Sequence, residues 1–314
     1  MLALESQGIS KTYQNKTVLL PLDFTLREGS SLAIVGPRKS GKTTALKILA
    51  GMIAPTRGKC SAFDIPARET RNLYKICGVS TDDTNLFPFL SGVDNLILIA
   101  SLYGIEKNAA HQKASELMKE LGIWEKREQK LAEYTPDDRA LLSIARALIH
   151  DPKILFYDQS GGEETEKSTR IIESFLRRQN EEKGLTLCVA TSDPELAGTL
   201  CVEYAILESG KCLGVGSFEE LLHEHPLPTY ARFQSNSAIE GLTRHGTWYE
   251  QAIESREEFP NLLRKIVFGG ADLFAAEIRE PTFRELYEII LEENATEETH
   301  SQEAAYETVP KTIQ

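Results

Sequence analysis

The sequence predicts an α/β fold with a largely parallel sheet, and two observations carry this prediction. First, an apolar run at residues 32–35 leads into a stretch that fits G-x-x-x-x-G-K-[ST], the phosphate-binding loop between a strand and a helix. Second, buried-strand patterns at 154–157 and 185–190 alternate with helical patterns at 137–149 and 163–182. Strands separated by helices pair in parallel, so the chain should build a sheet covered by helices.

The phosphate-binding loop supplies most of the candidate binding residues. Its backbone N–H groups should curl around an anion, and the helix that starts near Gly41 should point its positive end at that anion. We expect Lys42 to reach the β- and γ-phosphates of a nucleotide and the Thr43 hydroxyl to coordinate Mg²⁺. A chance match is disfavoured, because the strand and the helix that the motif requires are both present. The candidate nucleotide-binding residues of the loop are Gly36, Pro37, Arg38, Lys39, Ser40, Gly41, Lys42, Thr43 and Thr44.

Short strands surround this loop in the first eighty residues. Alternating apolar residues at 22–26 predict antiparallel strands before it, and further strands are expected near 60–63 and 76–80. Tyr13 lies in a polar stretch upstream of the loop, where an exposed aromatic ring can stack on an adenine. Packing of Tyr13 at the end of a strand explains the residue equally well.

Two helical patterns follow. Ser91 caps a helix that Gly104 stops, and a second helix runs from about residue 107 to Gly122. Together they predict an all-helical insertion at about 84–150, between the two halves of the sheet.

Asp158 ends the buried strand at 154–157. In a chain with a phosphate loop, a carboxylate at this place is the expected second part of a metal site, holding Mg²⁺ through water. Thr43 and Asp158 are therefore the candidate metal-binding residues.

The C-terminal third predicts a smaller α+β unit. Strand patterns near 248–253 and 273–278 flank a helical pattern at 259–267, and a capping box of Thr282 and Glu285 opens a last helix. We expect a main domain at 1–217, a connector with two prolines at 218–240, an accessory domain at 241–293 and a disordered, Glu-rich tail at 294–314.

Composition and charge restrict the class of protein. The net charge of −12 argues against a nucleic-acid partner that recognises a basic surface. The five cysteines show no C-x-x-C and no metal-ligand spacing, which favours reduced thiols in a cytosolic protein. We expect no signal peptide and find no apolar run long enough to span a bilayer, so a role at a membrane would require a partner.

The order of these parts resembles the nucleotide-binding subunit of an ABC (ATP-binding cassette) transporter over about residues 2–217. The residues that carry the resemblance are the phosphate loop, Leu86-Phe87-Pro88-Phe89-Leu90 with Asn95-Leu96, Ala145-Arg146-Ala147-Leu148, Asp151-Pro152-Lys153-Ile154-Leu155 and Glu208-Ser209-Gly210-Lys211. The C-terminal part is similar to the accessory domain of export-type cassettes. The resemblance implies a P-loop NTPase fold of ABC type, with ATP and Mg²⁺ as cofactors. It also implies a polytopic membrane subunit and a second cassette, identical or different, as partners, and a cytoplasmic location at the inner face of the cytoplasmic membrane.

The resemblance holds better at the residues that bind nucleotide than elsewhere. Tyr13 matches the aromatic that stacks on adenine, and the phosphate loop and Asp158 match their counterparts. Lys39 stands where the family usually has Gly. Asp82 replaces the glutamine that contacts Mg²⁺ and the membrane subunit, which puts the coupling to that subunit in doubt.

The residues that the family uses for hydrolysis do not match. Gln159 takes the place of the glutamate that acts as general base, and Ser192 takes the place of the switch histidine. A Gln side chain orients water but does not accept its proton. The signature loop aligns with Tyr-Thr-Pro-Asp-Asp at 134–138, where Pro136 lacks an N–H and the two Asp would cap their own helix and repel a triphosphate.

These substitutions predict a pseudo-ATPase that binds Mg-ATP and hydrolyses it slowly or not at all. Each composite site of a cassette dimer would combine the phosphate loop of one subunit with the signature of the other, so one such chain would impair both sites. Two alternatives stay open: a soluble regulatory or scaffold protein that uses ATP to set its shape, and a working ATPase whose base is Glu163 or Glu164.

Overall fold

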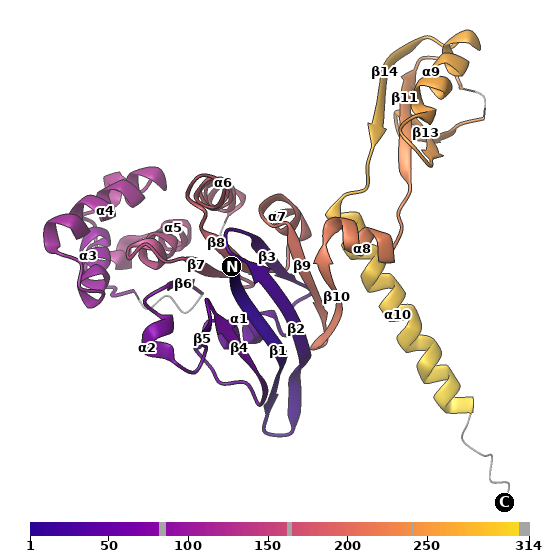
Figure 1. Cartoon of the computed structure of the whole chain (residues 1–314). Coiled ribbons are helices and arrows are strands. Elements are labelled where there is room, and N and C mark those ends of the chain that lie inside the picture. The colour runs from indigo at the N-terminus through magenta and orange to yellow at the C-terminus, as the bar shows by residue number, and fades with distance from the viewer. Residues whose placement is uncertain (82–85, 162–164, 240, 308–314) are drawn as a thin grey trace, which may run out of the picture.

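The computed structural model describes residues 1–81, 86–161, 165–239 and 241–307, with side chains up to residue 296. Its elements form three sheets with helices around them (Figure 1). In chain order they are β1 (Leu2–Tyr13), β2 (Lys16–Arg27), β3 (Ser31–Val35), α1 (Lys42–Leu49), β4 (Arg57–Ala62), β5 (Ile65–Pro66), α2 (Thr70–Leu73), β6 (Cys77–Ser80), α3 (Gly92–Leu102), α4 (Lys107–Glu120), the short 3₁₀ turns η1 (Trp124–Lys126) and η2 (Leu131–Glu133), α5 (Pro136–Leu148), β7 (Ile154–Gln159), α6 (Glu166–Lys183), β8 (Thr186–Thr191), α7 (Pro194–Leu200), β9 (Glu203–Glu208), β10 (Lys211–Ser217), α8 (Phe218–Glu224), β11 (Thr229–Ser235), β12 (Thr243–His245), β13 (Trp248–Ile253), α9 (Glu258–Phe268), β14 (Leu273–Arg279) and α10 (Phe283–Glu307).

A six-stranded sheet in the order β10-β9-β3-β8-β7-β6 forms the centre of the molecule. The strands from β9 to β6 run parallel, and β10 pairs antiparallel with β9. Both faces of this sheet are covered: Ala33 and Val35 of β3 belong to one apolar core, and Leu32 and Ile34 belong to the other. Strands buried on both faces have near-continuous apolar sequences, and such runs allow these strands to be predicted from the sequence. The predicted largely parallel sheet is confirmed.

A second sheet, in the order β2-β1-β4-β5, is antiparallel and lies against the first, with α1 contributing to the core between them. Leu46 and Leu49 of α1 are fully buried in that core. This arrangement confirms the antiparallel strands expected at the N-terminus and places the start of α1 at the edge where the two sheets meet.

The helical insertion consists of α3, α4 and α5, which lie together beside β6 and β7 (Figure 1). The Ser91 hydroxyl accepts a hydrogen bond from the N–H of Asp94 at 3.1 Å, so the predicted cap of α3 is present. Fully buried Asn95 exchanges hydrogen bonds of 2.7 and 3.1 Å with the backbone of Phe87 and thereby fixes the loop before the helix. The first part of that loop, with Thr84, lies outside the described residues.

Residues 218–240, expected to form a connector, contain a helix and a strand. Ser217 and Glu220 form a capping box that starts α8, and β11 is an inner strand of a third sheet in the order β12-β13-β11-β14. Phe233 of β11, Tyr249 of β13 and Ile266 of α9 belong to a small apolar core of their own. The accessory unit therefore includes β11, whose short alternating pattern was masked by the prolines that precede it.

Within the described residues, the buried apolar side chains of the last helix join the core of the central sheet and not that of the third sheet. The Phe283 ring stacks on Tyr204 of β9 with 3.7 Å between ring centroids, and Leu286 and Ile290 join the core beneath the central sheet. Figure 1 shows α10 running from the base of the accessory unit down along β10. The helix continues through residues 294–307, where we had expected disorder, and residues 308–314 lie outside the described part. In the described ranges, no helix is both long and apolar enough to cross a membrane.

Candidate nucleotide-binding site

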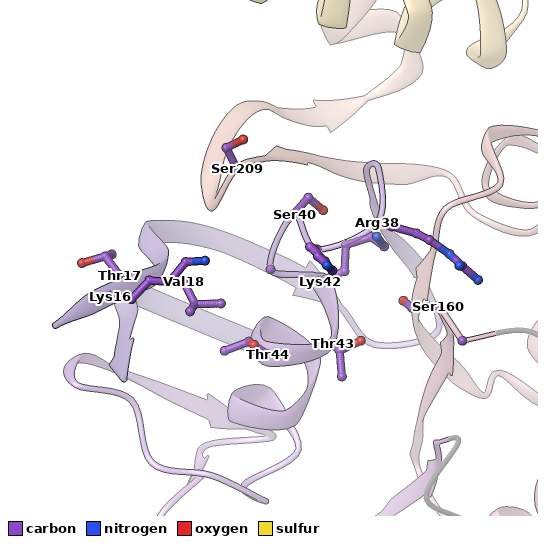
Figure 2. A pocket seen from close by; sticks show the side chains of 13 residues that line it. Lys16, Thr17, Val18, Arg38, Ser40, Lys42, Thr43, Thr44, Ser160 and Ser209 are labelled. Atoms are coloured by element: carbon purple, nitrogen blue, oxygen red, sulfur yellow. The ribbon is translucent and has the colours of Figure 1, made fainter. Parts of the chain in front are cut away.

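An open pocket of about 700 Å³ lies over the phosphate loop (Figure 2). Its wall combines the loop with the start of β2, the turn between β9 and β10, and the segment after β7. Four of its lining side chains are cationic, and no lining residue in the described ranges is acidic, so the pocket favours an anion. The lining residues are Lys16, Thr17, Val18, Arg38, Lys39, Ser40, Gly41, Lys42, Thr43, Thr44, Ser160, Gly161 and Ser209.

Lys42 occupies the first turn of α1 and is almost completely buried, with 3% of its surface exposed. Its ammonium group donates hydrogen bonds to the carbonyl oxygens of Gly36 at 2.9 Å and Pro37 at 2.8 Å. Burial lowers the pKa of Lys42 to about 8, against the attraction of the Asp158 carboxylate, which raises it. The Lys42 ammonium is thus a desolvated cation. Among the described residues, no Asp or Glu side chain forms a hydrogen bond with it.

The backbone of the loop leaves no room for side chains at two of its glycines. A Cβ on Gly36 would lie 1.9 Å from the carbonyl oxygen of Leu207, and Gly41 has φ +104° with a Cβ position 2.8 Å from the oxygen of Val18. Lys39 also adopts a positive φ, +67°. This left-handed conformation costs a residue with a Cβ roughly 1–2 kcal/mol. Lys39 therefore stands in a backbone conformation that is suited to glycine.

Unpaired serine hydroxyls fit a group rich in acceptor oxygens, and two of them, Ser40 and Ser160, line the pocket. Among the described residues, the Oγ atoms of Ser40, Ser160 and Ser192 are buried and have no hydrogen-bond partner. Native proteins rarely leave buried polar atoms unpaired, so such atoms mark a place where a ligand or water completes the bonding. With the glycine cradle and Lys42, they make the site suitable for a triphosphate. Thr43 and the buried Asp158 carboxylate are the oxygen donors suited to Mg²⁺.

Gln159 is held against the neighbouring strand at the end of β7. Its Oε1 accepts a hydrogen bond of 2.6 Å from the hydroxyl of Thr191, its register partner on β8. Asp158 accepts a hydrogen bond of 3.1 Å from the N–H of Ser160 and so turns the chain after the strand. Glu163 and Glu164, the alternative bases, and Asp82 lie outside the described residues.

Tyr13 lies outside the lining of the pocket. It ends β1 with 47% of its surface exposed, and the Lys11 ammonium lies 5.1 Å from its ring centroid. The corresponding wall of the pocket is built by Lys16, Thr17 and Val18 on β2, which the sequence reading missed. The stacking of Tyr13 on adenine stays a prediction.

Comparisons with a family model and with individual known proteins identify the same family. Residues 19–160 match the ABC transporter family. The lipoprotein-releasing system ATP-binding protein LolD of Syntrophus aciditrophicus is 31% identical over 189 residues, which cover 58% of this chain and 85% of that protein. The chain belongs to the ABC transporter ATP-binding proteins.

Further likenesses extend over the same part of this ABC cassette. The linearmycin resistance ATP-binding protein LnrL of Bacillus subtilis is 24% identical over 220 residues, covering 69% of this chain and 70% of that protein. A solved dimeric bacterial ABC transporter cassette is 25% identical, with a TM-score of 0.63, and covers 68% of this chain and 98% of that one. ABC cassettes bind ATP, typically with Mg²⁺, and work with membrane components of a transporter complex, so this chain is the ATP-binding subunit of such a complex.

Residues 134–138, which are predicted to take the place of the family signature, form hydrogen bonds among themselves. Thr135 caps α5 with its hydroxyl, which accepts from the N–H of Asp138 at 3.2 Å, while the Asp138 carboxylate accepts from the N–H of Thr135 at 3.1 Å. Lys126 forms an ion pair with the same carboxylate. The sequence predicts that Asp137 and Asp138 both cap this helix. Asp138 does so, in a capping box with Thr135, whereas Asp137 binds to a different helix.

Asp137 is used in a second structural contact that the sequence did not reveal. Its carboxylate accepts hydrogen bonds from the N–H of Thr165 at 2.8 Å, the Thr165 hydroxyl at 2.7 Å and the Ser168 hydroxyl at 2.9 Å. These bonds hold the pKa of Asp137 below its ordinary value, the bond from the Thr165 N–H most of all. Thr165 is the N-cap residue that precedes α6, so a carboxylate from α5 lies at the N-terminus of the neighbouring helix.

Proposed function

We propose that this ABC cassette binds Mg-ATP as a structural ligand and is impaired in hydrolysing it. The observation that carries the proposal is Gln159: the position of the general base holds an amide whose oxygen already accepts a hydrogen bond from Thr191. An amide does not accept a proton from the attacking water, and loss of a positioned base typically costs about 10²–10⁴ in rate. Ser192 offers a hydroxyl in place of the imidazole that would contact the γ-phosphate.

Binding is supported by the residues that remain in place. We expect Lys42 to supply the charge for the β- and γ-phosphates, the loop N–H groups to surround them, and Thr43 and Asp158 to hold Mg²⁺. When bound, Mg²⁺ neutralises phosphate charge. The unpaired hydroxyl of Ser40 and the glycine cradle support the same ligand.

The signature loop extends the impairment to the partner cassette in a dimer. Pro136 has no N–H to donate, and Asp137 and Asp138 present carboxylates that are committed to α6 and α5. Since like charges at short range repel, this surface should stabilise a partner-bound triphosphate poorly. A dimer with a competent cassette would therefore contain two weakened sites, each through a different defect.

We propose that the cassette docks on a polytopic membrane subunit of export type and pairs with a second cassette, as a peripheral cytoplasmic protein. The side chain of Phe89, in the loop that Asn95 fixes, is 86% exposed, and Phe87 beside it is 45% exposed. Neighbouring exposed aromatic side chains on an ordered loop favour a protein contact. The relatives named for linearmycin resistance and lipoprotein release support an export-type assembly.

The test measures binding and hydrolysis on the same full-length chain. We expect Mg-dependent binding of a non-hydrolysable ATP analogue by calorimetry, together with phosphate release far below about 1 s⁻¹. The assembled complex, purified with its membrane subunit, should show the same low turnover. A complex whose second cassette is competent should also turn over slowly, because each of its two composite sites is weakened. Steady-state turnover of the isolated chain at ordinary enzyme rates would refute the proposal, and so would the absence of nucleotide binding.

A further inference from the structure

Asn294 on α10 lies between the two residues that close the hairpin of β9 and β10. Its side-chain oxygen accepts a hydrogen bond of 3.0 Å from the Lys211 ammonium, and its side-chain N–H donates one of 2.8 Å to the Glu208 carboxylate. One orientation of the amide satisfies both charged partners at once. With 7% of its surface exposed, Asn294 is a buried polar residue on a helix that continues into the polar, Glu-rich end of the chain.

The hairpin turn that these residues close is a wall of the nucleotide pocket. Ser209 and Gly210 form the turn with φ of +48° and +83°, as a two-residue hairpin of the primed kind requires. Ser209 lines the pocket, and Figure 2 shows it at the pocket edge. A serine in this conformation is strained, so the turn depends on its surroundings to stay in place.

The same turn is bonded directly to the phosphate loop. The N–H of Gly210 donates to the carbonyl oxygen of Ser40 at 3.0 Å, and the N–H of Leu20 on β2 donates to the oxygen of Gly210 at 2.8 Å. A Cβ on Gly210 would lie 2.7 Å from the oxygen of Val18. The turn is therefore packed between the phosphate loop and β2 and is bonded to each. A shift of the turn should displace both the phosphate loop and the part of β2 that lines the pocket.

We propose that Asn294 is a positioning residue for the nucleotide pocket, acting through the hairpin turn, and that α10 thereby links the pocket to the accessory sheet. The inference rests on the proposed binding of Mg-ATP. It follows from an unbroken series of contacts: Asn294 holds Glu208 and Lys211, these close the turn of Ser209 and Gly210, and Gly210 holds Ser40. Because α10 follows directly on β14, the accessory sheet is joined to this series by the chain itself.

The test compares nucleotide binding in the full-length chain and its variants, with a non-hydrolysable ATP analogue and Mg²⁺ as the probe. Loss of one or two hydrogen bonds to charged groups should weaken analogue binding by about three- to tenfold in Asn294→Ala. The matched control is Glu292→Ala, an exposed residue on the same helix, which should bind like the unchanged chain.

A double-mutant cycle separates positioning from a general loss of stability. If Asn294 acts through the hairpin, Asn294→Ala should weaken binding little further in a chain that already carries Lys211→Met, because both changes release the same turn. Independent effects would instead multiply. Equal binding by Asn294→Ala and the unchanged chain, or multiplying effects in the double variant, would overturn the inference and leave the proposed function intact. Absence of binding by the unchanged chain would overturn both.

Discussion

The hydroxyl of Thr191 donates a hydrogen bond of 2.6 Å to the side-chain oxygen of Gln159, joining the ends of β8 and β7 next to Ser160, which lines the pocket. Thr191 also accepts a hydrogen bond of 3.0 Å from the N–H of Asp193, which caps α7. Gln159, which we predict to stand at the position of the general base, is thus part of a network that orders the strand ends. A carboxylate at the same place would keep this bond, because it accepts the Thr191 hydroxyl equally well.

Gln159→Glu should raise ATP hydrolysis with little change in folding. The new carboxylate is a proton acceptor in the position of the missing base, and we expect phosphate release to rise by about tenfold. The gain stays below the full factor of about 10²–10⁴ of a complete site because Ser192 and the loop at residues 134–138 are unchanged. Steady-state phosphate release by the full-length chain measures this, with Gln159→Ala as the control that should stay at the basal rate. A rate for Gln159→Glu equal to that of Gln159→Ala would show that the base is not what limits hydrolysis.

The sequence was most informative where one strong local pattern fixes the structure. The phosphate loop, the central strands and the capped helices α3 and α5 were legible because their signals lie within a few residues of each other. Contacts between distant segments were not. Nothing near Asp137 signals that it caps α6, and nothing near Asn294 signals that it reaches the hairpin of β9 and β10. The helix α10 was assigned to the accessory unit by proximity in the chain, whereas the apolar side chain of Phe283 finds a larger core on the cassette.

Asp137→Asn should destabilise the cassette at neutral pH without changing its hydrolysis. The amide retains one acceptor oxygen in place of two charged ones, so the cap of α6 weakens, and we expect the melting temperature to fall by about 2–5 °C. Glu181→Gln, an exposed change on the same helix, is the matched control.

The pH dependence of this effect has a definite sign. The pKa of Asp137 lies below its ordinary value of 3.8 in the folded chain, so its contribution is present above pH 3.8 and is lost as the pH falls through the lowered pKa. The difference in urea midpoint between the variant and the unchanged chain should therefore shrink below about pH 4. A difference that stays constant to pH 3 would mean that the charge of Asp137 does not contribute.

Lys39→Gly should stabilise the phosphate loop. Glycine adopts the φ of +67° at this position without the strain that a Cβ causes. The relief of this strain stabilises the folded chain by more than the extra backbone entropy of glycine stabilises the unfolded chain. We expect the melting temperature to rise by about 2–3 °C. Arg38→Gly is the control, because Arg38 does not have a positive φ and the change there should destabilise. A fall in the melting temperature of Lys39→Gly would show that the lysine side chain makes a contact worth more than the strain.

Nucleotide affinity should decrease as the pH rises above 8, because Lys42 must be protonated to hold the phosphates. Burial lowers its pKa to about 8 in the free protein, so by pH 9 most molecules must take up a proton when they bind. We expect the dissociation constant of the Mg-bound ATP analogue to rise by about five- to tenfold between pH 7 and pH 9. The free energy of unfolding of the nucleotide-free protein should rise as the pH increases from 8 to 10.5. Over this range Lys42 is protonated in the unfolded chain and largely deprotonated in the folded chain. Lys42→Arg keeps its charge throughout and should give a flat profile, whatever its absolute affinity, while Lys42→Met should lose binding. A profile of the unchanged chain as flat as that of Lys42→Arg would contradict the assignment of Lys42 as the phosphate-binding cation.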